Sequence, residues 1–248
     1  MTAHELKSLL TEKTLWRLLF KSALAVFSLS LVYGFGFHPV AVLAGIIVFA
    51  AMYLRETGER SLLKYSFLLL PLLFIFTAAF ITPEGAWAAV LVFISFLLFF
   101  AVFGLANLFF RERFLVYGVL NTALLVSFFL FFFYLARGPE NFWLLGPALF
   151  ITTFFLLKEV LIFFGFSGKR RLALHAGALS LISLEFFHIS QFLPLGFINA
   201  AAYIAIFLVL AKDLVVSSIN GTLNFSFMMK QITLFLVLTI VVFAASTW

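Results

Sequence analysis

Long apolar stretches follow one another along almost the whole chain, separated only by short polar or charged interruptions. A helix that crosses the hydrocarbon core of a bilayer needs about 20 such residues, within a range of roughly 17 to 25. Nine stretches approach or meet this requirement, at residues 15–37, 40–54, 65–82, 86–110, 114–136, 142–166, 172–193, 197–210 and 231–243. The pattern predicts an all-α, polytopic transmembrane helix bundle of about nine helices, or eight if the first two stretches form a re-entrant hairpin.

Composition excludes a water-soluble fold. Of the 248 residues, 65% are hydrophobic and 10% are charged, against roughly 25% charged residues in an average soluble domain. The longest polar connection, about 212–230, is too short to bury a core of its own, so no soluble domain is predicted. We expect a single integral membrane domain, 1–248, whose residues 1–14 form an amphipathic cytoplasmic segment. Charges spread through this segment argue against a cleaved signal peptide.

The basic residues indicate how the chain is threaded, because cytoplasmic loops of membrane proteins gather lysine and arginine. With the N-terminus in the cytoplasm, 14 of the 16 lysines and arginines fall on the cytoplasmic side of the predicted helices. We therefore expect a multi-pass protein of the cell membrane with a cytoplasmic N-terminus and an outside C-terminus. The net charge of +6 reflects this asymmetry, and no nucleic-acid partner is predicted.

The stretch LEFFHISQFL at 184–193 places Glu185 and His188 three residues apart in an apolar helix, on nearly the same face. Three interpretations remain open: a structural pair joined by a hydrogen bond, an ion or proton pathway, or a metal site. The Glu-x-x-His spacing occurs in di-metal bundles, but the second copy that such a site requires is missing, and no metal is predicted. Gln191 and Asn199 extend this candidate intramembrane polar cluster toward the outer turn.

Lys158 and Glu159 are candidate buried charges within the sixth predicted helix. Their side chains point about 100° apart, so each needs its own partner. A lysine this close to the cytoplasmic end can extend its long stem to the interface. Lys158 is therefore expected to anchor the helix, with a gate or counter-charge for an anionic substrate as the alternative.

The basic cluster Lys169, Arg170 and Arg171 precedes the seventh predicted helix, with His175 close by. Anionic lipid headgroups of the cytoplasmic leaflet are the expected partners of such a cluster. Recognition of a phosphorylated substrate is the alternative.

A few polar residues and glycines are expected to serve helix packing. Asn121 and the pair Thr152-Thr153 are predicted to hydrogen-bond across helix contacts, and Gly34 and Gly45 to allow close approach in the first hairpin. Lys212 and Asp213 are expected to close the eighth helix at the interface.

No motif identifies a reaction. Cysteine is absent, and the G-x-S-x-G, H-E-x-x-H and G-x-x-x-x-G-K-[ST] patterns are absent from the sequence as well. No catalytic residue and no cofactor are predicted. We expect a non-catalytic assembly or scaffold subunit, with other membrane subunits as partners. Two alternatives remain: a proton- or ion-coupled carrier that uses Glu185 and His188, and a membrane-embedded enzyme that acts on a lipid-linked substrate.

Overall fold

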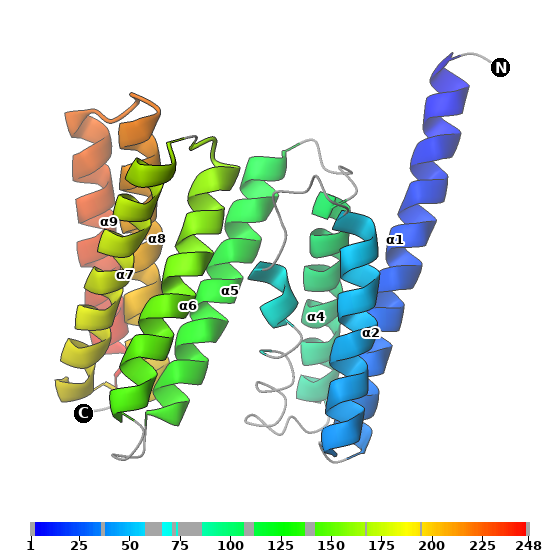
Figure 1. The fold of residues 1–248 in the computed structure, drawn as a ribbon, viewed down its shortest axis with the longest axis horizontal. Coiled ribbons are helices and arrows are strands. Elements are labelled where there is room, and N and C mark those ends of the chain that lie inside the picture. The colour runs from blue at the N-terminus through cyan, green and yellow to red at the C-terminus, as the bar shows by residue number, and fades with distance from the viewer. Residues whose placement is uncertain are drawn as a thin grey trace. The chain divides into compact units, whose positions relative to one another are not determined.

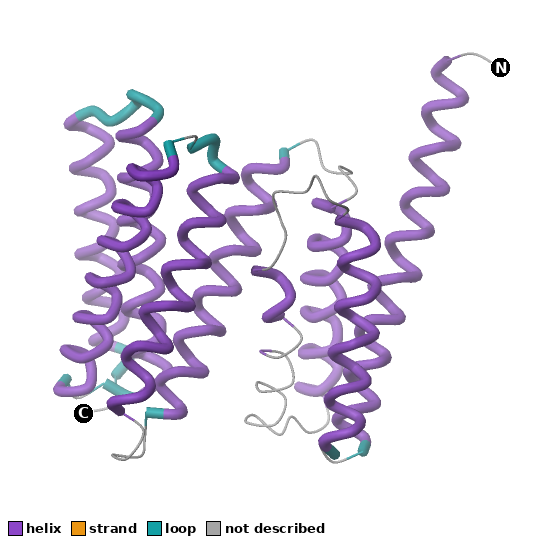
Figure 2. Tube along the Cα trace, in the orientation of Figure 1, coloured by secondary structure: helices purple, strands orange, loops and turns teal. Residues whose placement is uncertain are grey.

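The computed structural model describes residues 3–35, 38–57, 66–70, 73, 86–106, 112–136, 142–166, 168–193 and 195–246. These residues form eight α-helices and one 3-10 helix, without a strand among them (Figures 1 and 2). The elements are α1 (Ala3–Gly34), α2 (Pro39–Thr57), η1 (Ser66–Leu68), α4 (Ala86–Ala106), α5 (Arg113–Leu135), α6 (Phe142–Phe163), α7 (Lys169–Phe192), α8 (Phe197–Ile219) and α9 (Phe225–Ala244).

Six of the helices are long and apolar enough to cross a membrane. The spans are Lys13–Gly34, Phe114–Leu135, Leu145–Phe163, Arg170–Phe192, Phe197–Ile219 and Phe225–Ala244, and two shorter apolar segments are Pro39–Arg55 and Ala89–Leu105. The all-α class is confirmed and is compatible with a multi-pass membrane protein. The predicted count of nine is not confirmed, since most of the predicted third span, 65–82, lies outside the described residues, apart from η1, Leu69, Leu70 and Leu73.

The chain divides by its packing into two compact units, residues 1–120 and 121–248. In the first unit, α1 packs against both α2 and α4. A side-chain carbon at Gly45 would lie 3.0 Å from a methyl group of Val32, so this glycine does permit the close approach that the sequence predicts. Gly34 meets nothing within 4 Å, and the prediction for it is wrong.

In the second unit, α6, α7 and α8 each pack against the next helix in the chain. Aromatic rings connect α5 to α7, α7 to α8 and α8 to α9. The ring of Phe133 on α5 lies 4.7 Å from that of Phe187 on α7, and Phe186 on α7 stacks at 4.1 Å on Phe207 of α8. The Phe207 ring in turn lies 5.7 Å from Phe235 of α9. Aromatic contacts of this kind add to the packing of the unit.

The eighth helix is longer than predicted. Its apolar pattern was expected to end at residue 210, but α8 continues to Ile219, and the connection to α9 is only residues 220–224. The three residues Leu214, Val215 and Val216 continue the apolar sequence beyond the charged pair. Lys212 and Asp213 therefore lie within the helix, about 10 Å before its end at 1.5 Å per residue, and the prediction that they close it is wrong.

Candidate functional site

The buried face of α7 consists largely of small and apolar residues. Ser180, Ser183 and Ser190 are buried, and their hydroxyls donate to the carbonyls of Ala176, Leu179 and Phe187 within the same helix. Small side chains let neighbouring helices approach closely. This face turns toward the rest of the unit, and the opposite face of α7 is exposed.

Glu185 lies on that exposed face. It makes no hydrogen bond and no ion pair within the part of the chain that the structure describes. Seven positions separate it from Phe192 and sixteen from Lys169, so it lies about 10 Å from the C-terminal end of α7 and about 24 Å from the N-terminal end. It belongs to the apolar segment Arg170–Phe192, which is long enough to cross a membrane.

His188 does not pair with Glu185. Its Nδ1 lies 2.7 Å from the carbonyl oxygen of Leu184; a carbonyl can only accept, so the ring proton is on Nδ1. A side-chain carbon added at Gly146 would lie 3.8 Å from His188 Cε1, which shows that the ring faces α6. Residues three apart differ by about 60° around a helix, and here that difference separates a packed histidine from an exposed glutamate. Of the three interpretations of this stretch, the hydrogen-bonded pair finds no support in the described residues.

The rest of the predicted polar cluster does not converge either. Gln191 is exposed on α7. The amide of Asn199, at the start of α8, donates to Ser246 Oγ at 3.1 Å and to the Ala245 carbonyl at 3.4 Å. These partners follow the end of α9. Asn199 therefore ties α8 to the chain beyond α9, and no hydrogen bond joins any two of the four predicted cluster residues.

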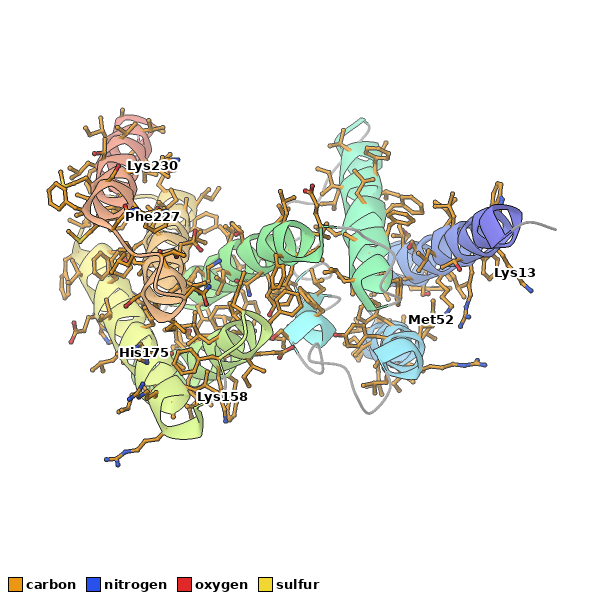
Figure 3. All side chains as sticks on the ribbon, turned by 90° about the horizontal axis from the view of Figure 1, so that it is seen from above. Lys13, Met52, Lys158, His175, Phe227 and Lys230 are labelled. Atoms are coloured by element: carbon orange, nitrogen blue, oxygen red, sulfur yellow. The ribbon has the colours of Figure 1, made fainter. Side chains whose placement is uncertain are left out.

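Lys158 and Glu159 lie on different sides of α6. Both are half-buried. The Lys158 ammonium lies 6.0 Å from the centre of the Phe154 ring, at the outer limit of a cation–π contact, and in Figure 3 its side chain points outward from α6. Lys158 is about 8 Å from the C-terminal end of the helix. The Oε1 atom of Glu159 is buried.

The basic cluster lies in the first turn of α7, where Arg170 and Arg171 are exposed and Lys169 begins the helix. His175 Nδ1 lies 2.7 Å from the Arg171 carbonyl, and its ring is 5.5 Å from that of Phe166. No side chain caps the N-terminus of α7, since its N-cap residue is Gly168. Both arginines are therefore exposed at the N-terminal end of α7.

Lys212 is the buried charge that the sequence interpretation missed. It is 3% exposed, its Nζ lies 3.2 Å from Asp213 Oδ1, and the same nitrogen lies 5.7 Å from the centre of the Phe164 ring. The helical spacing of the sequence already places Lys212 on the buried face of α8. Lys212 follows Ala201, Ala205 and Leu208 at helical spacing, and all three are buried.

Asn121 and Thr153 are also buried, on α5 and α6, with no exposed surface. Within the described residues, neither polar atom of the Asn121 amide has a hydrogen-bond partner, and neither does the Thr153 hydroxyl. Thr152 donates to its own helix, at the Ala148 carbonyl. The predicted hydrogen bonds across helix contacts are therefore wrong for these residues.

No metal-binding constellation is found among the described residues. No group of three or more histidines, aspartates or glutamates lies close enough there to hold a metal ion. Comparison with known proteins gives no relative: no protein-family model, no curated protein and no solved structure matches this chain.

Proposed function

We propose that this chain is a non-catalytic assembly or scaffold subunit of the cell membrane, with its N-terminus in the cytoplasm and its C-terminus outside. The observation that carries the proposal is the position of Glu185, exposed at membrane depth without a partner in the described part of the chain. A charged carboxylate near the bilayer centre costs about 2.5 to 3.5 kcal/mol on insertion scales. A side chain of another membrane protein that hydrogen-bonds to Glu185 offsets this cost.

The peripheral position of α9 supports the same proposal. Among its 20 residues, all of them described, only Val242 is buried. Phe227 and Lys230 of this helix lie at the margin of the second unit in Figure 3. An apolar helix attached through one side adds exposed surface to the unit without enclosing any interior space.

An enzyme that uses Glu185 on a lipid-linked substrate held by the basic cluster is less well supported. Fifteen residues of α7 separate Arg170 from Glu185, which corresponds to about 22 Å along the helix. A headgroup bound at the arginines does not reach the carboxylate.

A carrier is the second candidate. The buried and unsatisfied side chains of Asn121 and Thr153 favour it, because each buried polar group left without a hydrogen bond costs roughly 1 to 3 kcal/mol and a bound water or solute removes that cost. Glu185 is not one of these interior residues, since it lies on the outer surface of the unit.

Native electrophoresis of membranes solubilised in mild detergent tests the proposal. We expect the wild-type chain to migrate within a complex, and Glu185→Leu to release it because leucine offers no hydrogen bond. Glu185→Gln should retain most of the complex, since the amide still donates and accepts. Gln191→Leu is the matched control, because it removes another exposed polar side chain from the same helix.

Three results contradict the proposal. The first is a complex that Glu185→Leu leaves intact, and the second is a wild-type chain that migrates alone. The third is a purified chain in proteoliposomes that dissipates a pH gradient while Asn121→Leu does not, which establishes the carrier instead.

A further inference from the structure

The lysines and arginines described in the second unit all lie toward one of its ends. This end holds the α6–α7 and α8–α9 connections (Figure 1), and we call it the basic end. Its only described carboxylates are those of Glu159 and Asp213, and Asp213 is paired with Lys212. The basic residues are six in number: Lys158, Lys169, Arg170, Arg171, Lys212 and Lys230. The basic end therefore carries an excess of positive charge that an anionic partner complements.

Two contacts show how α6 and α7 are aligned. A side-chain carbon at Gly146 would lie 3.6 Å from a methyl carbon of Leu184, and one at Gly177 would lie 3.9 Å from the ring of Phe154. As the position on α6 increases, the position that it meets on α7 decreases, so the two helices are antiparallel. We call this line of contact the α6–α7 seam.

Lys158 and Arg170 lie on either side of the α6–α7 seam near the basic end. The Lys158 ammonium lies 6.0 Å from the centre of the Phe154 ring, which is the ring that reaches Gly177. Arg170 precedes Gly177 by seven positions, close to two full turns, so it points to nearly the same side of α7. In this alignment Lys158 is level with residue 173, and Arg170 is only about 4.5 Å nearer the basic end.

Neither of these two cations has a carboxylate partner among the residues that the structure describes. A phosphate group carries several oxygens that accept charge-assisted hydrogen bonds, and it can therefore accept from an ammonium and a guanidinium together. Both side chains are long and flexible enough to close on one anion. The charge and the spacing of this pair match one phosphate.

Exposed apolar side chains continue the same surface away from the basic end. Ile151 precedes Lys158 by seven positions and Leu181 follows Arg170 by eleven, so each lies within about 20° of its cation around the helix. Ile151 is 53% exposed and Leu181 is 50% exposed, and Phe155 beside Ile151 is 60% exposed. A phospholipid presents an anionic phosphate and apolar chains in this order, whereas a free phosphate has nothing to cover the apolar part.

We propose that Lys158 and Arg170 bind the phosphate of one anionic phospholipid, whose acyl chains lie along α6 and α7 past Ile151 and Leu181. This site goes beyond the proposed function, since it requires no other subunit. It also differs from attraction by the whole basic cluster. Arg171 is turned by about 100° from Arg170, away from the α6–α7 seam, and takes no part in the site.

Lipid titration of the purified chain in a neutral detergent tests the site, with native mass spectrometry to count the lipids that stay bound. The probes are phosphatidylglycerol and phosphatidylcholine with the same acyl chains. We expect the wild-type chain to bind phosphatidylglycerol more tightly. Lys158→Gln and Arg170→Gln should each weaken that binding about fivefold, since one basic residue near anionic lipid contributes roughly 1 kcal/mol. Lys158→Arg should retain it, because the positive charge remains.

Arg171→Gln and Lys230→Gln are the matched controls, because each removes one positive charge from the basic end and leaves the α6–α7 seam intact. Arg171 is as exposed as its neighbour Arg170 by class. Lys230 lies about 8 Å from the start of α9, the same depth as Lys158, and is directed elsewhere in Figure 3. We expect both controls to bind phosphatidylglycerol like the wild type. Circular dichroism of each variant confirms that the helices are retained.

Three results overturn the inference. Equal weakening by Arg171→Gln or Lys230→Gln would show that the lipid responds to the total charge of the basic end. Equal binding of the two lipids by the wild-type chain would show that the phosphate is not held by unpaired cations. Displacement of the lipid by inorganic phosphate would identify a free anion as the ligand. If Lys158→Gln does not fold, the comparison of Arg170→Gln with Arg171→Gln decides the matter alone.

Discussion

Lys212 on α8 and Glu185 on α7 belong to the same unit, but their charged groups have opposite environments. Lys212 is buried, with Asp213 at 3.2 Å and the Phe164 ring at 5.7 Å. Glu185 is exposed, with no partner in the described residues. A charge that is satisfied inside its own unit is explained by packing. A charge in an apolar helix that is left unsatisfied there supports the proposed contact with another molecule.

The largest effect on stability is expected where the internal pairing is broken. Asp213→Ala leaves the Lys212 ammonium buried without its carboxylate, which should lower the free energy of unfolding by roughly 1.5 to 3 kcal/mol, the range for a hydrogen bond to a charged group. Reversible unfolding of the purified chain by denaturing detergent measures this change.

Lys212→Met is the control for that experiment. It removes the ammonium as well and keeps an apolar stem of similar length, so it should cost less than Asp213→Ala, because replacing a buried charge by a packed apolar group is often close to neutral. An Asp213→Ala chain as stable as the wild type would show that Lys212 is not confined, and the comparison with Glu185 would break down.

A smaller effect is expected where the start of α8 meets the end of α9, because the hydrogen bond there joins two neutral side chains. Asn199→Ala removes the donor to Ser246 and should lower the free energy of unfolding by about 1 kcal/mol. Ser246→Ala should have a similar effect, and the double variant should cost less than the sum, because the two residues share one interaction. Additive losses in the same unfolding measurement would show that α8 and the end of α9 are held by other contacts.

Sequence reasoning located the helices more reliably than their ends. The predicted stretches 142–166 and 172–193 agree closely with α6 and α7, because a run of apolar residues long enough to cross a bilayer is a strong signal. The end of α8 was misplaced because two charged residues after an apolar run, here Lys212 and Asp213, usually mark the boundary between membrane and water. Their side chains interact with each other and with Phe164, which allows the helix to continue past them.

The sequence also did not distinguish the two faces of α7. Lipid tails are as apolar as leucine, so buried and lipid-facing positions have similar side chains. The position of Glu185 could not be predicted from apolar residues alone. The small residues Ser180, Ser183 and Ser190 did mark the buried face, and extrapolating from them puts Glu185 on the other side. Nothing in the sequence predicts that Asn121 and Thr153 are buried without hydrogen bonds.

The stability of the monomeric chain with Glu185→Leu tests the central claim most directly, that Glu185 is not satisfied within its own chain. In a detergent that keeps the chain monomeric, the free energy of unfolding should be unchanged within about 0.5 kcal/mol, the usual range for surface substitutions away from specific contacts. A loss of roughly 1 to 3 kcal/mol would mean that Glu185 hydrogen-bonds inside the chain, and that result would contradict the account.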